Sequence, residues 1–147
     1  LLGLDDVVNK KAGKLSGGIQ RRLSIAMALI SEPKILFLDE PTLGLDVISR
    51  SDLWDIIRSL KGEITVVLTT HYMEEAIYSD RIFVMDKGSI VMQGTPKQVF
   101  SQVEQLKELR LDVPQATLLA YELQKAGVNL DDGILSKEGL VEALCRL

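Results

Sequence analysis

The sequence predicts an α/β fold, in which a mostly parallel sheet with helices and a β-hairpin is followed by a small helical C-terminal subdomain. Two short apolar runs, at 35–38 and 64–68, flank a segment with helical periodicity, a pattern typical of a strand–helix–strand unit. Two further short runs within 81–94 surround an Asp-Lys-Gly turn, and the rest of the chain predicts three amphipathic helices. We therefore expect two domains, residues 1–100 and residues 101–147.

The first helix is predicted to follow Gly18 and to end near Ser31, because Pro33 disfavours helix at the residue before it. The next helix is expected over roughly 47–60, with Asp46 as its N-cap. A right-handed crossover through this helix makes the strands on either side of it parallel. Because their apolar runs do not alternate with polar residues, we expect both strands to be buried on both faces.

The hairpin is followed by a helix that should begin at Thr95 as N-cap and Pro96 as first residue. In the C-terminal subdomain, the helices carry apolar residues that have two interpretations. They pack only on their own domain, or they form a contact between two subunits. The residues concerned are Leu118, Leu119, Leu123, Leu140, Val141 and Leu144.

The composition is that of an ordinary globular chain, with 147 residues of which 46% are hydrophobic and 26% charged. A net charge of −4 argues against a sequence-independent nucleic-acid binder, since such proteins usually have a basic face. No apolar run approaches the length of a membrane-spanning helix. The single cysteine, Cys145, can form no internal disulfide.

A candidate anion-binding segment lies at the start of the first helix, in the stretch Leu-Ser-Gly-Gly. A helix N-terminus offers unpaired N–H groups to an anion, and Gly17 and Gly18 allow the backbone to approach it closely. Ser16 adds a hydroxyl donor. The alternative for this segment alone is a helix cap with a flexible lead-in.

A second set of candidate residues follows the two predicted strands. Asp39 ends the first strand, and its carboxylate suits Mg²⁺, which prefers oxygen ligands. Glu40 comes next and could polarise an attacking water. His71, the only histidine, closes the second strand and should share the same edge of the sheet. The alternatives are a solvated acidic turn and a structural histidine.

In their order and separations, the motifs LSGGIQ, ILFLDEPTLGLD and TTH resemble those of ATP-binding cassette (ABC) ATPases. LSGGIQ is similar to the ABC signature, residues 35–40 to Walker B, residues 43–46 to the D-loop and His71 to the switch histidine. The resemblance implies a P-loop ATPase fold and places the signature to switch-histidine motifs in the C-terminal part of that domain. The tail beyond residue 100 resembles the C-terminal region of energy-coupling factor (ECF) transporter ATPases.

The resemblance implies ATP and Mg²⁺ as cofactors and a role for each candidate residue. A signature group would contact the γ-phosphate of ATP held by the opposite subunit, with Gln20 supporting that contact; it consists of Ser16, Gly17, Gly18 and Gln20. Asp39 would hold Mg²⁺, Glu40 would orient or deprotonate the attacking water, and His71 would sense the γ-phosphate. Asp46 would link the two ATP sites across the dimer.

The ECF resemblance also implies partners and a location. The chain would pair with a second ABC ATPase subunit and with integral membrane transporter subunits, at the cytoplasmic face of the cell membrane, and would bind no nucleic acid. Such transporters take up vitamins or transition-metal ions. Two alternatives stay open: an ABC ATPase of another importer or a soluble ABC protein in DNA maintenance or translation, and a non-catalytic dimerisation module.

The chain departs from the family pattern in three respects. It contains no G-x-x-x-x-G-K-[ST] loop, no glutamine loop and no aromatic residue placed to stack on adenine, and it begins with Leu1 rather than Met. We expect these parts to precede Leu1 in a longer protein. On that expectation, the 147-residue chain alone does not hydrolyse ATP measurably.

Overall fold

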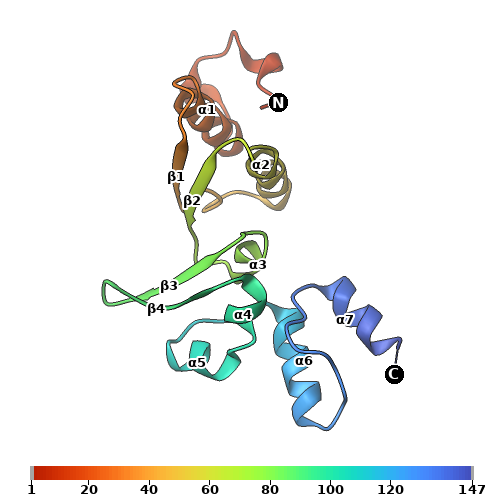
Figure 1. Ribbon diagram of the computed structural model, residues 1–147. Coiled ribbons are helices and arrows are strands. Elements are labelled where there is room, and N and C mark those ends of the chain that lie inside the picture. The colour runs from red at the N-terminus through yellow and green to blue at the C-terminus, as the bar shows by residue number, and fades with distance from the viewer. Residues whose placement is uncertain (1, 147) are drawn as a thin grey trace. The chain divides into compact units, whose positions relative to one another are not determined.

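The computed structural model describes residues 2–146 and divides into two compact units, Leu1–His71 and Tyr72–Leu147. Figure 1 shows the order of the elements along the chain. The predicted strand–helix–strand unit lies in the first unit, and the predicted hairpin and C-terminal helices lie in the second. Among the described residues, none of the helices combines the length and apolar character that crossing a bilayer requires.

The first unit contains two 3₁₀ turns, two helices and a two-stranded parallel sheet. Its elements are η1 (Asp5–Val7), η2 (Ala12–Lys14), α1 (Gly17–Leu29), β1 (Ile35–Asp39), α2 (Val47–Ser59) and β2 (Thr65–Thr69). The parallel pairing of β1 with β2 is confirmed, with Ile35 opposite Thr65 and Asp39 opposite Thr69. This register brings the carboxyl ends of both strands to the same edge of the sheet.

One face of this sheet packs against the helices. The core cluster joins one residue of α1, one of β1, the inner face of α2 and the residue that caps its C-terminus. It consists of Ile25, Leu36, Leu53, Trp54, Ile57 and Leu60. Leu53 is fully buried, as expected for the centre of a helix whose apolar residues recur at helical spacing.

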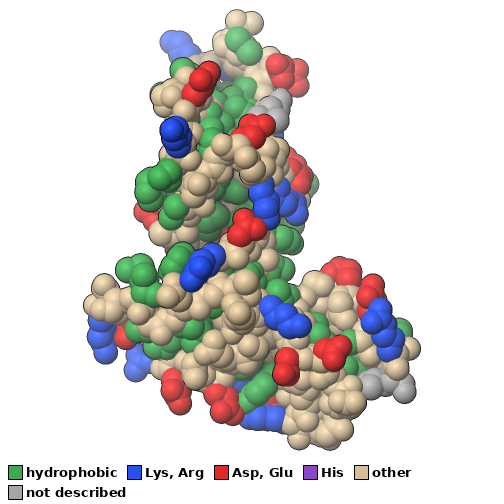
Figure 2. All heavy atoms as spheres, viewed as in Figure 1, with side chains coloured by type: hydrophobic (Ala, Val, Ile, Leu, Met, Phe, Trp, Pro, Cys, Tyr) green, Lys and Arg blue, Asp and Glu red, His purple; other side chains and the backbone are tan. Residues whose placement is uncertain are grey.

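The prediction that both strands are buried on both faces is wrong. Ile35, Phe37 and Val67 point away from the core and are 51%, 74% and 43% exposed. Strand side chains alternate between two faces, and among the described residues only the face that carries Leu36 is covered. Hydrophobic side chains therefore reach the surface of the molecule (Figure 2).

The second unit contains the predicted hairpin and a set of short helices. Its elements are α3 (Met73–Ala76), β3 (Ile82–Asp86), β4 (Ser89–Gly94), α4 (Pro96–Phe100), α5 (Val103–Glu108), α6 (Gln115–Lys125) and α7 (Lys137–Leu144). The hairpin turn is confirmed, and Lys87 and Gly88 both adopt positive φ, as the tight turn requires. The helix predicted at Thr95 is also confirmed, with a complete capping box between Thr95 and Gln98.

Two hydrophobic clusters hold this unit together. One joins the hairpin to α4 and α5, and consists of Val84, Met92, Val99, Phe100, Val103, Leu106 and Val113. The other joins α6 to α7 through Ala116, Ala120, Leu130 and Leu140. The first cluster includes residues on both sides of residue 100, and the two compact units divide between His71 and Tyr72. The assignment of domains to residues 1–100 and 101–147 stays a prediction.

Candidate functional site

The candidate site lies at the carboxyl ends of β1 and β2. Asp39 is the last residue of β1 and pairs in register with Thr69, the last residue of β2. The Thr69 hydroxyl donates to Oδ1 of Asp39 over 2.5 Å and accepts from the backbone N–H of Glu40 over 3.0 Å. A single hydroxyl thus contacts both of the acidic residues that the sequence singled out.

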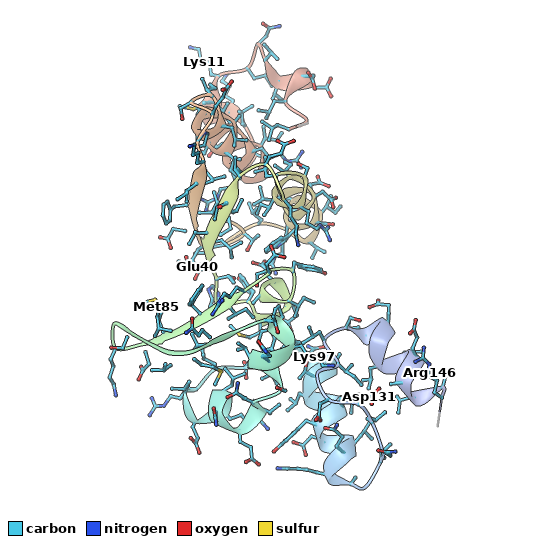
Figure 3. The ribbon with its side chains drawn as sticks, in the orientation of Figure 1. Lys11, Glu40, Met85, Lys97, Asp131 and Arg146 are labelled. Atoms are coloured by element: carbon cyan, nitrogen blue, oxygen red, sulfur yellow. The ribbon has the colours of Figure 1, made fainter. Side chains whose placement is uncertain are left out.

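Glu40 lies just beyond the end of β1 (Figure 3) and has an unusual main-chain conformation. Its φ is 43°, in the left-handed region that non-glycine residues rarely adopt. Its carbonyl oxygen accepts from the backbone N–H of Leu43 over 3.2 Å and from Nη2 of Arg21, on α1, over 3.3 Å. The chain therefore reverses direction directly after the strand, and the Glu40 side chain turns toward β2.

His71 contacts Glu40 directly. Its Nδ1 lies 2.9 Å from Oε1 and 3.0 Å from Oε2 of Glu40. An ionised carboxylate only accepts hydrogen bonds, so Nδ1 is the donor in this contact when Glu40 is ionised. The side chains of His71 and Glu40 are 55% and 30% exposed, which leaves the pair accessible from solvent. The sequence predicted a shared edge of the sheet, and the structure brings the two side chains into contact.

The candidate anion-binding segment begins α1, as predicted. Ser16 is the N-cap, and its hydroxyl accepts from the N–H of Ile19 over 3.5 Å. Gly17 and Gly18 are the first two helical residues. A Cβ on Gly18 would lie 2.6 Å from Oγ and 2.8 Å from Cβ of Ser49, on α2. The close approach that Gly18 permits in the structure is thus between two helices.

Gln20 has a structural role in the described contacts. Its side-chain amide donates to the carbonyl oxygens of Ala12 over 3.2 Å and Leu15 over 3.0 Å. These bonds tie the turn before α1 to the helix itself. A supporting role in a phosphate contact stays a prediction for Gln20, as direct phosphate contact does for Ser16, Gly17 and Gly18.

Asp46 is the N-cap of α2, as predicted from the sequence. Its Oδ1 accepts from the N–H of Ser49 over 3.0 Å, and its Oδ2 accepts from the Ser49 hydroxyl over 2.7 Å. These two hydrogen bonds, the backbone one first, hold the pKa of Asp46 below its usual value. Asp46 is therefore ionised at neutral pH at the positive end of the α2 dipole.

Sequence reasoning missed three residues of this region: Thr69, Arg21 and Ser49. Thr69 could have been found from the parallel pairing, because it lies opposite Asp39 and two residues before His71. No signal in the sequence indicates the contact of Arg21 with Glu40 or the close approach of Gly18 to Ser49, since both depend on how α1 packs against its neighbours.

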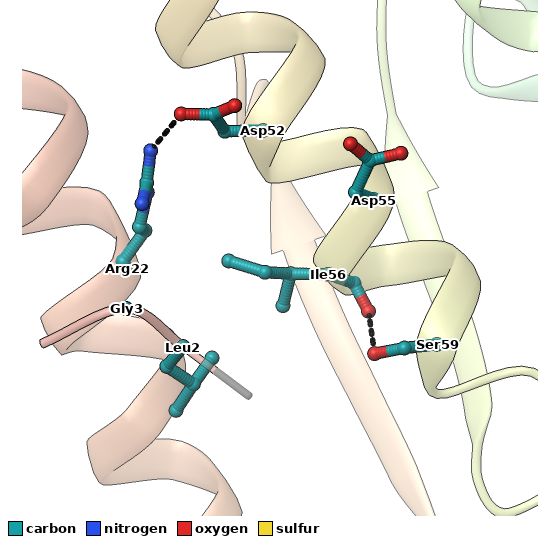
Figure 4. A pocket seen from close by; sticks show the side chains of 7 residues that line it. All are labelled: Leu2, Gly3, Arg22, Asp52, Asp55, Ile56 and Ser59. Atoms are coloured by element: carbon teal, nitrogen blue, oxygen red, sulfur yellow. Dashed lines mark hydrogen bonds and ion pairs between the residues drawn. The ribbon is translucent and has the colours of Figure 1, made fainter.

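A separate hollow of about 300 Å³ lies where the start of the chain meets α1 and α2 (Figure 4). Arg22 and Asp52 form an ion pair on its wall, and Leu2 and Gly3 also line it. Asp39, Glu40 and His71 do not line it. We therefore place the candidate site at the strand ends and not in this hollow.

The Mg²⁺ expected at Asp39 can be tested against the donors present. Asp39 and Glu40 are adjacent carboxylates at the strand ends, with the Thr69 hydroxyl on Asp39. Among the described residues there is no cluster of three or more metal-ligating side chains. Mg²⁺ bound through one or two carboxylates, with water and phosphate as its other ligands, fits such a donor set.

The chain is similar to known transport proteins. Residues 1–43 match the family model described as "ABC transporter". Over 135 residues the chain is 51% identical to the energy-coupling factor transporter ATP-binding protein EcfA1 of Clostridium perfringens, a match that covers 90% of this chain and 48% of the relative. It is 41% identical over 147 residues to EcfA2 of Streptococcus agalactiae, covering 98% of this chain and 52% of the relative.

Two solved structures that are similar to this chain are also described as parts of ABC transporters. CbiO1 from Clostridium perfringens, described as part of the ABC transporter complex cbiONQ, matches with a TM-score of 0.63 and 36% identity over 74% of this chain and 44% of that one. MJ1267, described as an ATP-binding cassette of an ABC transporter, matches with a TM-score of 0.66 and 29% identity over the same shares. The chain spans about half the length of the curated relatives it matches.

Proposed function

We propose that this chain, which is similar to the ATP-binding proteins of energy-coupling factor transporters over most of its length, supplies part of the ATP-hydrolysing site of such a transporter. The observation that carries the proposal is the contact of His71 with Glu40 beside Asp39, at the ends of two parallel strands. Open α/β sheets bind ligands at that edge.

Each candidate residue has a proposed task in this site. Glu40 accepts a proton from, or orients, the water that attacks the terminal phosphate. His71 holds the Glu40 carboxylate through Nδ1 and contacts the same phosphate. Asp39 is the proposed magnesium ligand. When bound, Mg²⁺ neutralises charge on the phosphate oxygens.

The start of α1 is proposed to serve the ATP of an opposite subunit. Ser16, Gly17 and Gly18 present a hydroxyl and the unpaired N–H groups of a helix N-terminus, which suit an anion. Gln20 supports this segment by its bonds to the preceding turn. Asp46, at the start of the neighbouring helix, is proposed to link the two sites.

The location, partners and transported substrates are also proposals. We propose that the protein acts at the cytoplasmic face of the membrane, paired with a second ATPase subunit and with integral membrane subunits that take up vitamins or transition-metal ions. Residues 1–100 form part of the ATPase domain in this proposal, and residues 101–147 form the helical subdomain. The 147-residue chain alone is expected to show no measurable turnover.

The test is the substitution Glu40→Gln in the complete protein with its partner subunits. We expect ATP turnover to fall by about a hundredfold or more, because the carboxylate that handles the proton is lost, while nucleotide binding persists. Glu32→Gln is the matched control, since Glu32 also has a left-handed main chain, with φ 47°, but is not part of the site. Equal turnover in the Glu40 and Glu32 variants would contradict the proposed role.

A further inference from the structure

We propose that Thr69 is a positioning residue, whose hydroxyl fixes both the carboxylate of Asp39 and the main chain of Glu40 for ATP hydrolysis. The inference rests on the proposed function and adds to it a role for Thr69, a residue of the TTH motif to which the sequence analysis gave no task. A threonine hydroxyl has one proton to donate and two lone pairs to accept with. The Thr69 hydroxyl donates its hydrogen bond to Oδ1 of Asp39, and one of its lone pairs accepts a hydrogen bond from the N–H of Glu40.

The two bonds have different consequences. The bond to Asp39 is 2.5 Å long and occupies one carboxylate oxygen, so it sets the direction in which the second oxygen points. The bond from Glu40 is 3.0 Å long and engages an N–H that lies beyond the strand, where the ladder of β1 with β2 has ended. The hydroxyl thus extends the pairing of the two strands by one residue, through a side chain.

The main chain of Glu40 needs such support because of its conformation. A glutamate with φ 43° is strained, and such residues persist only where their surroundings hold them. Thr69 holds the N–H of Glu40, and Arg21 holds its carbonyl oxygen over 3.3 Å. Both main-chain polar groups are therefore bound by side chains, one from β2 and one from α1.

The position of the Glu40 carboxylate follows from its main chain. If Glu40 moved to an ordinary extended conformation, its side chain would leave the direction in which it now contacts Nδ1 of His71. Thr69 lies two residues before His71 on the same segment, so the support for Glu40 and its side-chain partner come from one strand end. A misplaced carboxylate would reduce turnover without removing any phosphate contact.

A purely structural interpretation of Thr69 can be separated from this proposal with a neighbour on the same strand. Thr65 lies four residues earlier on the same face of β2, is also exposed, and pairs with Ile35. Threonine suits any strand position because it is β-branched. Valine keeps that shape and removes only the hydroxyl, and serine keeps the hydroxyl and removes only the methyl group.

The experiment compares Thr69→Val, Thr69→Ser and Thr65→Val in the complete protein with its partner subunits. For Thr69→Val we expect kcat for ATP hydrolysis to fall by about ten- to a hundredfold while KM changes by less than about threefold, since geometry and not binding is lost. Thr69→Ser should restore most of kcat, and Thr65→Val should match the unsubstituted protein. A Thr69→Val enzyme with normal kcat, or a Thr69→Ser enzyme as slow as Thr69→Val, would overturn the proposal.

A second measurement does not depend on activity. Hydrogen exchange of the Glu40 amide should accelerate by about tenfold or more in Thr69→Val, because its acceptor is removed, and should be unchanged in Thr65→Val. Unchanged exchange in Thr69→Val would show that Thr69 does not hold Glu40. Faster exchange with normal turnover would show that it holds Glu40 without serving hydrolysis, and the proposal would again be wrong.

The two proposals fail in different ways. If Glu40→Gln hydrolyses ATP normally, the proposed function of Glu40 is wrong, whatever exchange shows for Thr69→Val. If Glu40→Gln is inactive and Thr69→Val is fully active, the proposed function stands and the positioning role of Thr69 is refuted.

Discussion

The contact between α1 and α2 predicts different effects on stability for the same substitution at two neighbouring glycines. A Cβ on Gly18 would lie 2.6 Å from Oγ and 2.8 Å from Cβ of Ser49, whereas a Cβ on Gly17 would meet only Cδ2 of Leu45, at 3.9 Å. Carbon atoms in favourable contact are about 3.5–4.0 Å apart. The Gly18→Ala variant must therefore separate α1 from α2 locally by close to an ångström, on the order of the shortfall in that distance.

Ser49 cannot yield by rotating its side chain. Its Cβ is fixed to the backbone of α2, and its hydroxyl donates to Oδ2 of Asp46 over 2.7 Å, a bond that rotation would break. Overpacking of this kind costs about 1–3 kcal/mol. Alanine in place of glycine favours the helix by up to about 1 kcal/mol, less near its first turn, and this gain is common to both variants.

The difference between the two variants therefore isolates the clash. We expect Gly18→Ala to be less stable than Gly17→Ala by about 1–3 kcal/mol in urea unfolding. In thermal unfolding, each kcal/mol corresponds to a shift in Tm of about 2–4 °C for a chain of this size. A Gly18→Ala variant as stable as Gly17→Ala would refute the close packing of Gly18 on Ser49.

Three further predictions concern stability and ionisation. The pKa of Glu104 lies below its usual value, first because the Tyr121 hydroxyl donates to its carboxylate over 2.6 Å and then because of other donors. Tyr121→Phe should therefore raise the pKa of Glu104, which an NMR titration would measure. A carboxyl group whose pKa is lowered by folding stabilises the fold at pH values above its ordinary pKa, and this stabilisation is lost as the pH falls through the lowered value. Tyr121→Phe should therefore lose stability at neutral pH and lose less in acid. Leu53→Ala should lower the free energy of unfolding by about 2–5 kcal/mol, because Leu53 is fully buried. Gly133→Ala should cost about 1 kcal/mol or more, since Gly133 has φ 76° and its added Cβ would displace the Lys97 side chain.

Controls for these variants come from the same chain. Val47→Ala, at a residue 83% exposed, should change the stability by no more than about 0.5 kcal/mol, in contrast to Leu53→Ala. In Gly13→Ala the added Cβ has no atom within 4 Å, so this variant should lose as little stability as Val47→Ala. If Gly133→Ala lost no more stability than Gly13→Ala, the strain argument for Gly133 would be excluded. An unchanged Glu104 pKa in Tyr121→Phe would contradict the hydrogen bond as the main cause of the shift.

Local sequence signals predicted most of the elements, because each has a local physical cause. Ser16, Asp46 and Thr95 cap the helices that follow them, through their own side-chain oxygens. The Asp-Lys-Gly turn similarly needs only the positive φ of Lys87 and Gly88. The burial of the strands was not predictable in the same way. An apolar run does not say what covers each face, and Phe37 is 74% exposed in a run that predicts a buried strand.

The candidate site was predictable in its location and less so in its contacts. Parallel strands end at the same edge of a sheet, so the amino-acid sequence alone places Asp39 and His71 near one another. The direct contact of His71 with Glu40 depends on the left-handed conformation of Glu40, which no residue pattern near it indicates. That conformation depends in turn on Thr69 and Arg21, which come from distant parts of the chain.

The conformation of Glu40 also determines which substitution tests its proposed chemistry. Its carboxylate contacts His71, while its main chain contacts Thr69 and Arg21, so a change at this position alters two sets of interactions. Glutamine keeps the length of the side chain and similar main-chain preferences, while it removes the negative charge and replaces one carboxylate oxygen with an amide NH2 group. Glycine would relieve the strain at φ 43° and at the same time free the turn, so a loss of turnover would have two causes. The effect of Glu40→Gln is therefore the one that reports on the carboxylate alone.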